Sequence, residues 1–294
     1  MRHLGLLAAL MAALFLASPA ACGGDNQGAE LKVVASIFPL ADFARNVGQD
    51  KIEVITLLPP GADPHSYDPK PGQVRDMAEA RVFIKNGAGL ESWAEKLVSA
   101  ADHHLVEIDT SEGIELIMDD ESNPHIWLDP VLAQEQVRDI RDALIEVDPQ
   151  NREFYQENAQ RYLAELDLLA AEIRRKVNTF STTSFIAFHP AWSHFARRFG
   201  LSEVAVIESR HSIEPLTPSH LAKVIERGKH EGVRVIFAKL KATPRAKQTV
   251  KDVAAEIDAE VIYLDPMGGP GLEDRDTYLN LMRYNLERIS QAME

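Results

Sequence analysis

The chain has 294 residues, enough for one large domain or two smaller ones at roughly 100–200 residues per domain. Hydrophobic residues make up 45% of it, which predicts a buried core and argues against a disordered chain. The formal net charge of −14 argues against nucleic-acid binding, which needs clustered Lys and Arg, and is compatible with a cationic ligand.

The first 30 residues have the pattern of an export signal followed by a tether. A basic start, a short apolar run and small residues predict a signal peptide over residues 1–21, because the run is shorter than the roughly 20 apolar residues of a membrane-spanning helix. Cys22 is the only cysteine, so disulfides and thiolate metal ligands are excluded. We expect Cys22 to carry a lipid. Pro19 stands where a lipobox usually has Leu, Val or Ile, so ordinary cleavage and a soluble secreted protein is the alternative. Residues 22–30 are expected to form a flexible tether.

Strands and helices then alternate through a predicted N-terminal lobe, residues 31–150. Segments with strand-like apolar runs lie at 31–37, 52–58, 81–87 and 104–109, and segments with helical spacing at 38–48, 71–80 and 91–101. This alternation indicates a parallel sheet with helices on its faces.

A long helix is predicted over residues 151–180. Apolar residues recur there at three- and four-residue steps, which indicates a helix of about 28 residues, or roughly 42 Å at a rise of 1.5 Å per residue. Pro149 separates it from a preceding helix. A single coiled-coil arm is one interpretation, but the α/β character of both flanks favours a rigid strut between two lobes.

Alternation resumes in a predicted C-terminal lobe, residues 181–294. Strands are expected at 184–189, 203–208, 233–238 and 260–265, and helices at 191–200, 217–232, 243–258 and 274–293. The sequence therefore predicts an α/β protein of two lobes. Each lobe is a mostly parallel β-sheet flanked by helices, and one long rigid helix joins them.

Two related motifs point to a metal site. DPHSYDP (63–69) and NPHIWLDP (123–130) each place a histidine between a proline and an aromatic residue. Ligands of parallel α/β sheets lie beyond the carboxyl ends of the strands, where the sequence places His65, His125, His189 and Asp265. Three neutral imidazoles and one carboxylate suit tetrahedral Zn²⁺, and acid should release the metal because the imidazoles must be unprotonated.

Other polar residues are weaker candidates. Glu208 ends the predicted strand at 203–208 and His211 follows it, and both are possible accessory ligands. Asp129 could orient the His125 imidazole or cap the following helix. His194, His220 and His230 lie on predicted helices, where a solvated face is expected. These last three are therefore not assigned to the site.

The chain resembles the substrate-binding proteins of bacterial ABC importers for zinc and manganese, which are also described as metal-binding, adhesin-like lipoproteins. The resemblance lies in VVASIFPLADFARNVG, LLPPGADPHSYDPKPGQV, NPHIWLDP, FIAFHPAWSHFARRFGL and EVIYLDPMGG, which span nearly the whole mature chain. It implies two lobes joined by a rigid helix, with a metal ion clamped between them. It also implies export to the periplasm or the outer face of the cytoplasmic membrane, and an ABC permease with its ATPase as partners.

The resemblance assigns the metal ligands as His65, His125, His189 and Asp265. A histidine at the third position favours zinc over manganese, since imidazole suits Zn²⁺ and oxygen suits Mn²⁺. Two segments depart from the family. Residues 110–124 are short and acidic where many zinc members have a histidine-rich loop, and Lys239 and Lys241 stand in the unusual stretch AKLKATP.

Three alternatives to a zinc importer component stay open: a manganese-preferring binding protein, an adhesin-like surface lipoprotein, and a zinc hydrolase. A hydrolase would need an open metal position with a base beside it, for which Glu208 is the candidate. The sequence has no HExxH motif, and Asp265 would close the coordination sphere. We therefore expect a monomeric binding protein and not an enzyme.

Overall fold

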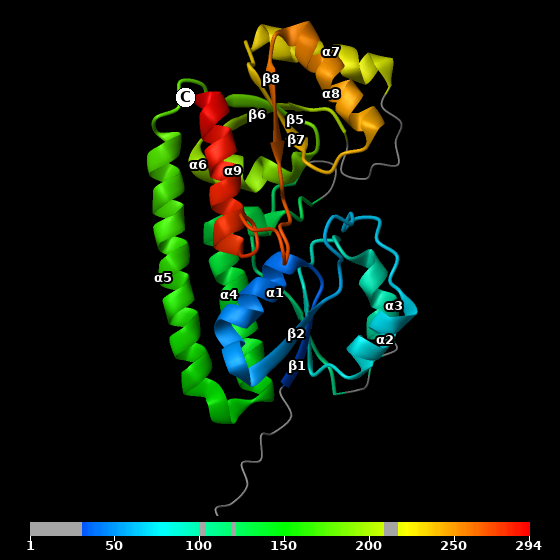
Figure 1. Cartoon of the computed structure of the whole chain (residues 1–294), viewed down its shortest axis with the longest axis vertical. Coiled ribbons are helices and arrows are strands. Elements are labelled where there is room, and N and C mark those ends of the chain that lie inside the picture. The colour runs from blue at the N-terminus through cyan, green and yellow to red at the C-terminus, as the bar shows by residue number, and fades with distance from the viewer. Residues whose placement is uncertain (1–30, 100, 102–103, 119–121, 209–216) are drawn as a thin grey trace, which may run out of the picture.

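The computed structural model describes residues 31–99, 101, 104–118, 122–208 and 217–294. Figure 1 shows two lobes, one above the other, with long helices beside them. The predicted two-lobed α/β fold is confirmed. The expectations for residues 1–30, including Cys22, and for His211 lie outside the described residues.

The N-terminal lobe holds a four-stranded parallel sheet in the order β2-β1-β3-β4. Its strands are β1 (Leu31–Ala35), β2 (Ile52–Thr56), β3 (Val82–Lys85) and β4 (Val106–Asp109). Its helices are α1 (Phe38–Gly48), α2 (Pro71–Ala78), α3 (Glu95–Val98) and α4 (Pro130–Val147). Because side chains alternate along a strand, Val34 and Phe83 pack toward α2 and α3, whereas Val33 and Ile84 belong to the core on the opposite face.

The C-terminal lobe repeats this arrangement with the sheet order β6-β5-β7-β8, also parallel throughout. Its strands are β5 (Ser184–Ala187), β6 (Ser202–Val206), β7 (Val235–Lys239) and β8 (Glu260–Leu264). Its helices are α6 (Ser193–Phe199), α7 (Pro218–His230), α8 (Pro244–Ile257) and α9 (Tyr278–Met293). Helices α7, α8 and α9 begin where a threonine hydroxyl accepts a backbone N–H, which satisfies a donor that the helix itself leaves open.

Helix α5 (Arg152–Val177) spans 26 residues and packs beside α4, to which a short turn joins it (Figure 1). Its buried side chains, among them Tyr155, Tyr162, Leu166 and Ile173, recur at helical spacing and form one apolar stripe. Leu168, off this stripe, is 69% exposed. The strut is therefore a packed part of the core along its whole length. None of the helices in the described segments is both long and apolar enough to cross a bilayer.

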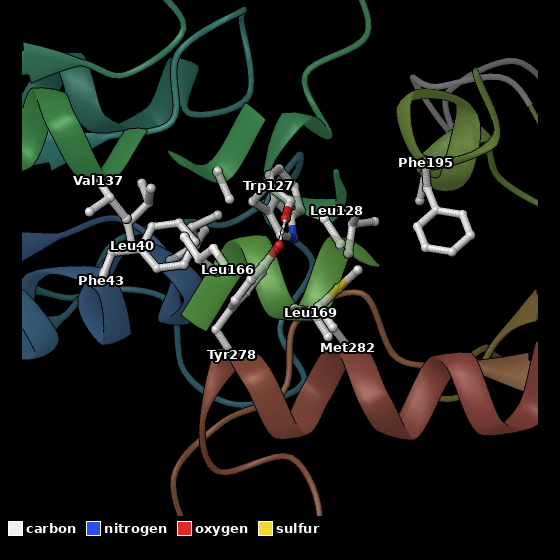
Figure 2. Close-up of a cluster of buried hydrophobic side chains, with 14 of the residues drawn as sticks. Leu40, Phe43, Trp127, Leu128, Val137, Leu166, Leu169, Phe195, Tyr278 and Met282 are labelled. Carbon is white, nitrogen blue, oxygen red and sulfur yellow. Dashed lines mark hydrogen bonds between the residues drawn. The ribbon is translucent and has the colours of Figure 1, made fainter. Parts of the chain in front are cut away.

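One hydrophobic cluster runs through both lobes. It contains Val33 of β1, Leu166 of α5, Phe185 of β5 and Ile289 of α9, and Figure 2 shows part of it around Trp127. Helices α1, α4, α5 and α9 thus contribute to a layer against which the inner faces of the two sheets pack. Helices α7 and α8 cover the outer face of the second sheet in a separate cluster. The lobes therefore share an interior, and the carboxyl ends of their strands are held at a fixed separation.

Candidate metal centre

Three histidines from three different loops meet between the lobes. His65 follows β2, His125 precedes the 3-10 helix Ile126–Leu128, and His189 lies two residues beyond β5. One ligand atom from each lies within 4.8 Å of the other two. The Nε2 atom of His125 is 3.3 Å from Nε2 of both His65 and His189. The structure thus brings together three of the four predicted ligands.

The separation of these nitrogens fits a common metal ion. A tetrahedral zinc with Zn–N bonds of about 2.0–2.1 Å places its ligand atoms about 3.3–3.4 Å apart, and the two His125 distances of 3.3 Å agree with this value. The rings of the three histidines lie at centroid distances of 5.0–5.2 Å and are steeply inclined to one another. The three rings thus converge on one point through their edges, as a ligand set requires.

Asn123, two residues before His125, fixes the orientation of that imidazole. The Asn123 amide nitrogen donates to the carbonyl oxygen of Pro190 at 2.8 Å, so its Oδ1 faces His125. This oxygen lies 2.8 Å from His125 Nδ1 and also accepts the His125 backbone N–H at 3.1 Å. Nδ1 must therefore carry the proton, which leaves the Nε2 lone pair free for a metal. Asn123 was not singled out from the sequence, although it lies inside the NPHIWLDP motif.

The His125 imidazole is neutral at neutral pH. Only 3% of this residue is exposed. Burial lowers its pKa well below the ordinary value, and the neighbouring His189, His65 and Lys239 lower the pKa further by charge repulsion. The unprotonated form that a metal needs is therefore the resting form of this ring.

Asp265, the fourth predicted ligand, lines the same pocket but is not in the set of mutually close ligand atoms. Its Oδ1 accepts the backbone N–H groups of Met267 and Gly268 at 3.0 and 3.1 Å, and its Oδ2 pairs with Arg275 at 3.1 Å. Only 8% of Asp265 is exposed. Its role as a fourth ligand stays a prediction, and the Arg275 ion pair competes for the same carboxylate.

A pocket of about 90 Å³ surrounds the histidine cluster and takes its walls from both lobes. The three histidines, Trp127 and Asp265 line it, together with the polar residues Asp63, Lys239 and Lys241. The unusual stretch AKLKATP therefore forms part of the pocket wall, where it brings positive charge close to the histidines.

The remaining candidates lie around this centre. Glu208 is half-buried and belongs neither to the histidine set nor to the pocket walls, so its accessory role stays a prediction. Asp129 caps α4 by accepting the Val131 backbone N–H at 2.9 Å, and its other oxygen accepts from Arg198 at 2.7 Å.

The expectation for His194 was wrong. It is 1% exposed, and its Nε2 lies 2.9 Å from the carbonyl oxygen of Asn123. It therefore supports the His125 loop from α6. The neighbouring Phe195, buried on the same short helix, was the available signal that this segment faces the core. His220 and His230 are exposed as expected.

Fold and site define a class: a two-lobed α/β protein with a histidine cluster, spaced for a metal ion, at the carboxyl ends of parallel strands from both lobes. Residues 33–292 match the family described as "zinc-uptake complex component A periplasmic", and the chain belongs to that family.

Curated relatives and solved structures agree with this membership. The high-affinity zinc uptake system protein ZnuA of Bacillus subtilis is 30% identical, over 97% of this chain and 96% of that protein. The manganese-binding lipoprotein MntA of Halalkalibacterium halodurans is also 30% identical, over 93% and 94%. A crystal structure of a zinc-bound ZnuA deletion mutant has a TM-score of 0.79 at 31% identity, with 90% of this chain and 98% of that chain covered.

Proposed function

We propose that this protein is the substrate-binding component of an ABC importer, which captures Zn²⁺ between its lobes and delivers it to a membrane permease and its ATPase. The observation that carries the proposal is the meeting of three Nε2 atoms from two lobes at the spacing of ligands on one ion. The names of the relatives, a zinc uptake system protein and a manganese-binding lipoprotein, support the transport role.

The ligand set favours zinc. Three imidazole nitrogens suit Zn²⁺ better than Mn²⁺, which prefers oxygen. Asp265 is the proposed fourth ligand, and its Oδ2 would exchange the pair with Arg275 for the ion. Because a carboxylate in that position closes the coordination sphere, the site is built to hold an ion and not to activate water. A manganese-preferring protein remains the second candidate, supported by the manganese-named relative.

The proposed role includes export and attachment to a membrane. A monomer whose signal peptide is removed and whose Cys22 carries a lipid would remain close to the permease. The lipoprotein name of a relative supports this arrangement. Because the lobes share one core, we infer that ions enter and leave through small movements of the ligand loops, with little rotation of one lobe against the other.

The test is elemental analysis of the purified protein, followed by calorimetric competition between zinc and manganese. Removal of one of three imidazole ligands in His125→Ala should weaken zinc binding by at least about 100-fold. His230→Ala, which removes an exposed histidine outside the site, is the control and should bind as the natural protein does. Asp265→Asn, which keeps an oxygen for the two backbone donors, tests the fourth ligand. Unchanged affinity in His125→Ala would refute the metal assignment.

A further inference from the structure

A charged link between the lobes lies at the wall of the histidine pocket. The Lys239 ammonium, at the end of β7, is 3.4 Å from Oδ2 of Asp63 in the loop after β2. The two side chains are 25% and 40% exposed, so solvent screens the pair only in part. This ion pair joins the second sheet to the loop that carries His65.

The same carboxylate holds the backbone of His65. Asp63 Oδ1 accepts the His65 backbone N–H at 3.0 Å, the turn that aspartate commonly forms with the residue two positions on. Its other oxygen faces Lys239. One carboxylate thus connects a lysine of the second lobe to a histidine of the first.

Lys239 balances the acidic groups around it. The Asp63 carboxylate is held from two sides, because one oxygen lies 3.4 Å from the Lys239 ammonium and the other accepts the His65 backbone N–H at 3.0 Å. Burial raises the pKa of the half-buried Glu208. Lys239 opposes this rise, and the Asp63 charge adds to it. Lys239 is therefore the positively charged partner that holds the Asp63 carboxylate in place.

We propose that Lys239 is a positioning residue for the metal site, which acts through Asp63 to hold His65 against the second lobe and so slows release of the bound ion. The inference rests on the proposed function. Simple electrostatics predicts the opposite sign, because a lysine beside a bound dication repels it and its removal would tighten binding. The sign of the effect therefore separates positioning from repulsion.

The experiment measures zinc release from the loaded full chain into excess chelator by stopped flow. Lys239→Met should release zinc about two- to fivefold faster, the scale of one partly exposed ion pair, and Lys239→Arg should restore a rate near that of the natural protein. Lys251→Met, which removes an exposed lysine on α8 outside the pocket, should change nothing. Asp63→Asn keeps the oxygen that accepts the His65 N–H, so combining it with Lys239→Met should add no further effect.

A second measurement does not depend on the metal. Backbone hydrogen exchange over residues 59–68 of the metal-free protein should be faster in Lys239→Met than in the natural protein and in Lys251→Met. Unchanged exchange, or zinc release that is unchanged or slower, would overturn the positioning role. Failure of the natural protein to bind zinc would instead refute the metal assignment, and the exchange result would still decide whether Lys239 holds the loop.

Discussion

The loops that carry His125 and His65 are held in different ways. The His125 loop is bonded to the second lobe at three buried or partly buried points: Asn123 to the Pro190 carbonyl, the Trp127 indole N–H to the Pro266 carbonyl at 2.7 Å, and Asp129 to Arg198. The His65 loop contacts the second lobe through the partly exposed Lys239–Asp63 pair and through the His189 ring, whose centroid is 5.2 Å from that of His65. The loop also lies close to Lys241 at Gly61 and to Gly269 at Pro60.

The fold alone fixes the position of His125, whereas we expect bound metal to contribute to fixing the position of His65. The His125 loop is part of the shared interior, and its ligand is oriented before any metal arrives. The His65 loop is held mainly from its own lobe, where the Trp93 indole N–H donates to the Pro64 carbonyl at 2.8 Å. Changes in the His125 loop should therefore lower both the free energy of unfolding and the metal affinity. Changes in the His65 loop should lower the metal affinity alone.

The largest effect on stability is expected from Asn123→Ala. This change removes buried hydrogen bonds to His125, to Pro190 and to the Ser193 hydroxyl, and leaves buried polar groups unpaired, which costs about 3 kcal/mol of unfolding free energy. Zinc affinity should fall roughly 10- to 100-fold because the imidazole loses its orienting partner. Urea unfolding of the metal-free protein and calorimetry measure the two losses. An affinity loss with unchanged stability would contradict the comparison.

A buried carboxylate next to the His125 loop should make the stability of the protein depend on pH. Glu91 is buried and accepts the backbone N–H groups of Asn86 and Gly87, and the Asn86 amide donates to the Pro124 carbonyl beside His125. Burial raises the pKa of Glu91 to about 7, from an ordinary value of 4.5. Between these pH values the folded state binds more protons than the unfolded state, so stability falls as pH rises.

Glu91→Gln should remove this loss. The free energy of unfolding of the natural protein should fall by up to about 3 kcal/mol between pH 4.5 and 7 relative to that of the variant. Urea unfolding of both metal-free proteins from pH 4.5 to 8 gives the difference, in which the titration of other groups cancels. Parallel profiles would show that Glu91 ionises normally in the folded protein.

A smaller effect is expected from Arg198→Met. The Asp129 side chain is 3% exposed and loses the partner of one oxygen, which should cost about 1–2 kcal/mol of unfolding free energy. The neighbouring Arg197 faces the exposed Glu115 at 3.8 Å, and Arg197→Met should cost less than about 0.5 kcal/mol. Thermal or urea unfolding compares the two variants. Equal losses would mean that burial of Asp129 does not control the contact.

Local patterns were enough to predict the sheets, the long helix and the three histidines. Alternating and helical periodicities identify elements and their faces, and parallel strands bring their carboxyl ends to one edge. They do not say which distant side chains pair. The burial of His194 depends on a contact with Asn123 of the other lobe. The Asp265–Arg275 pair and the orientation of His125 by Asn123 lie within one lobe each, but they depend on loop conformations that no periodicity in the sequence describes.

The single apolar cluster that crosses both lobes has a consequence for how the chain can be divided. A fragment that ends before α5 would lack the helix that packs on the apolar side chains of α1 and α4. A fragment that begins at β5 would expose Phe185 and Ile289 to water. Each half contains a complete four-stranded sheet, but neither half contains all the residues of the shared hydrophobic cluster. The protein should therefore fold and unfold as one cooperative unit.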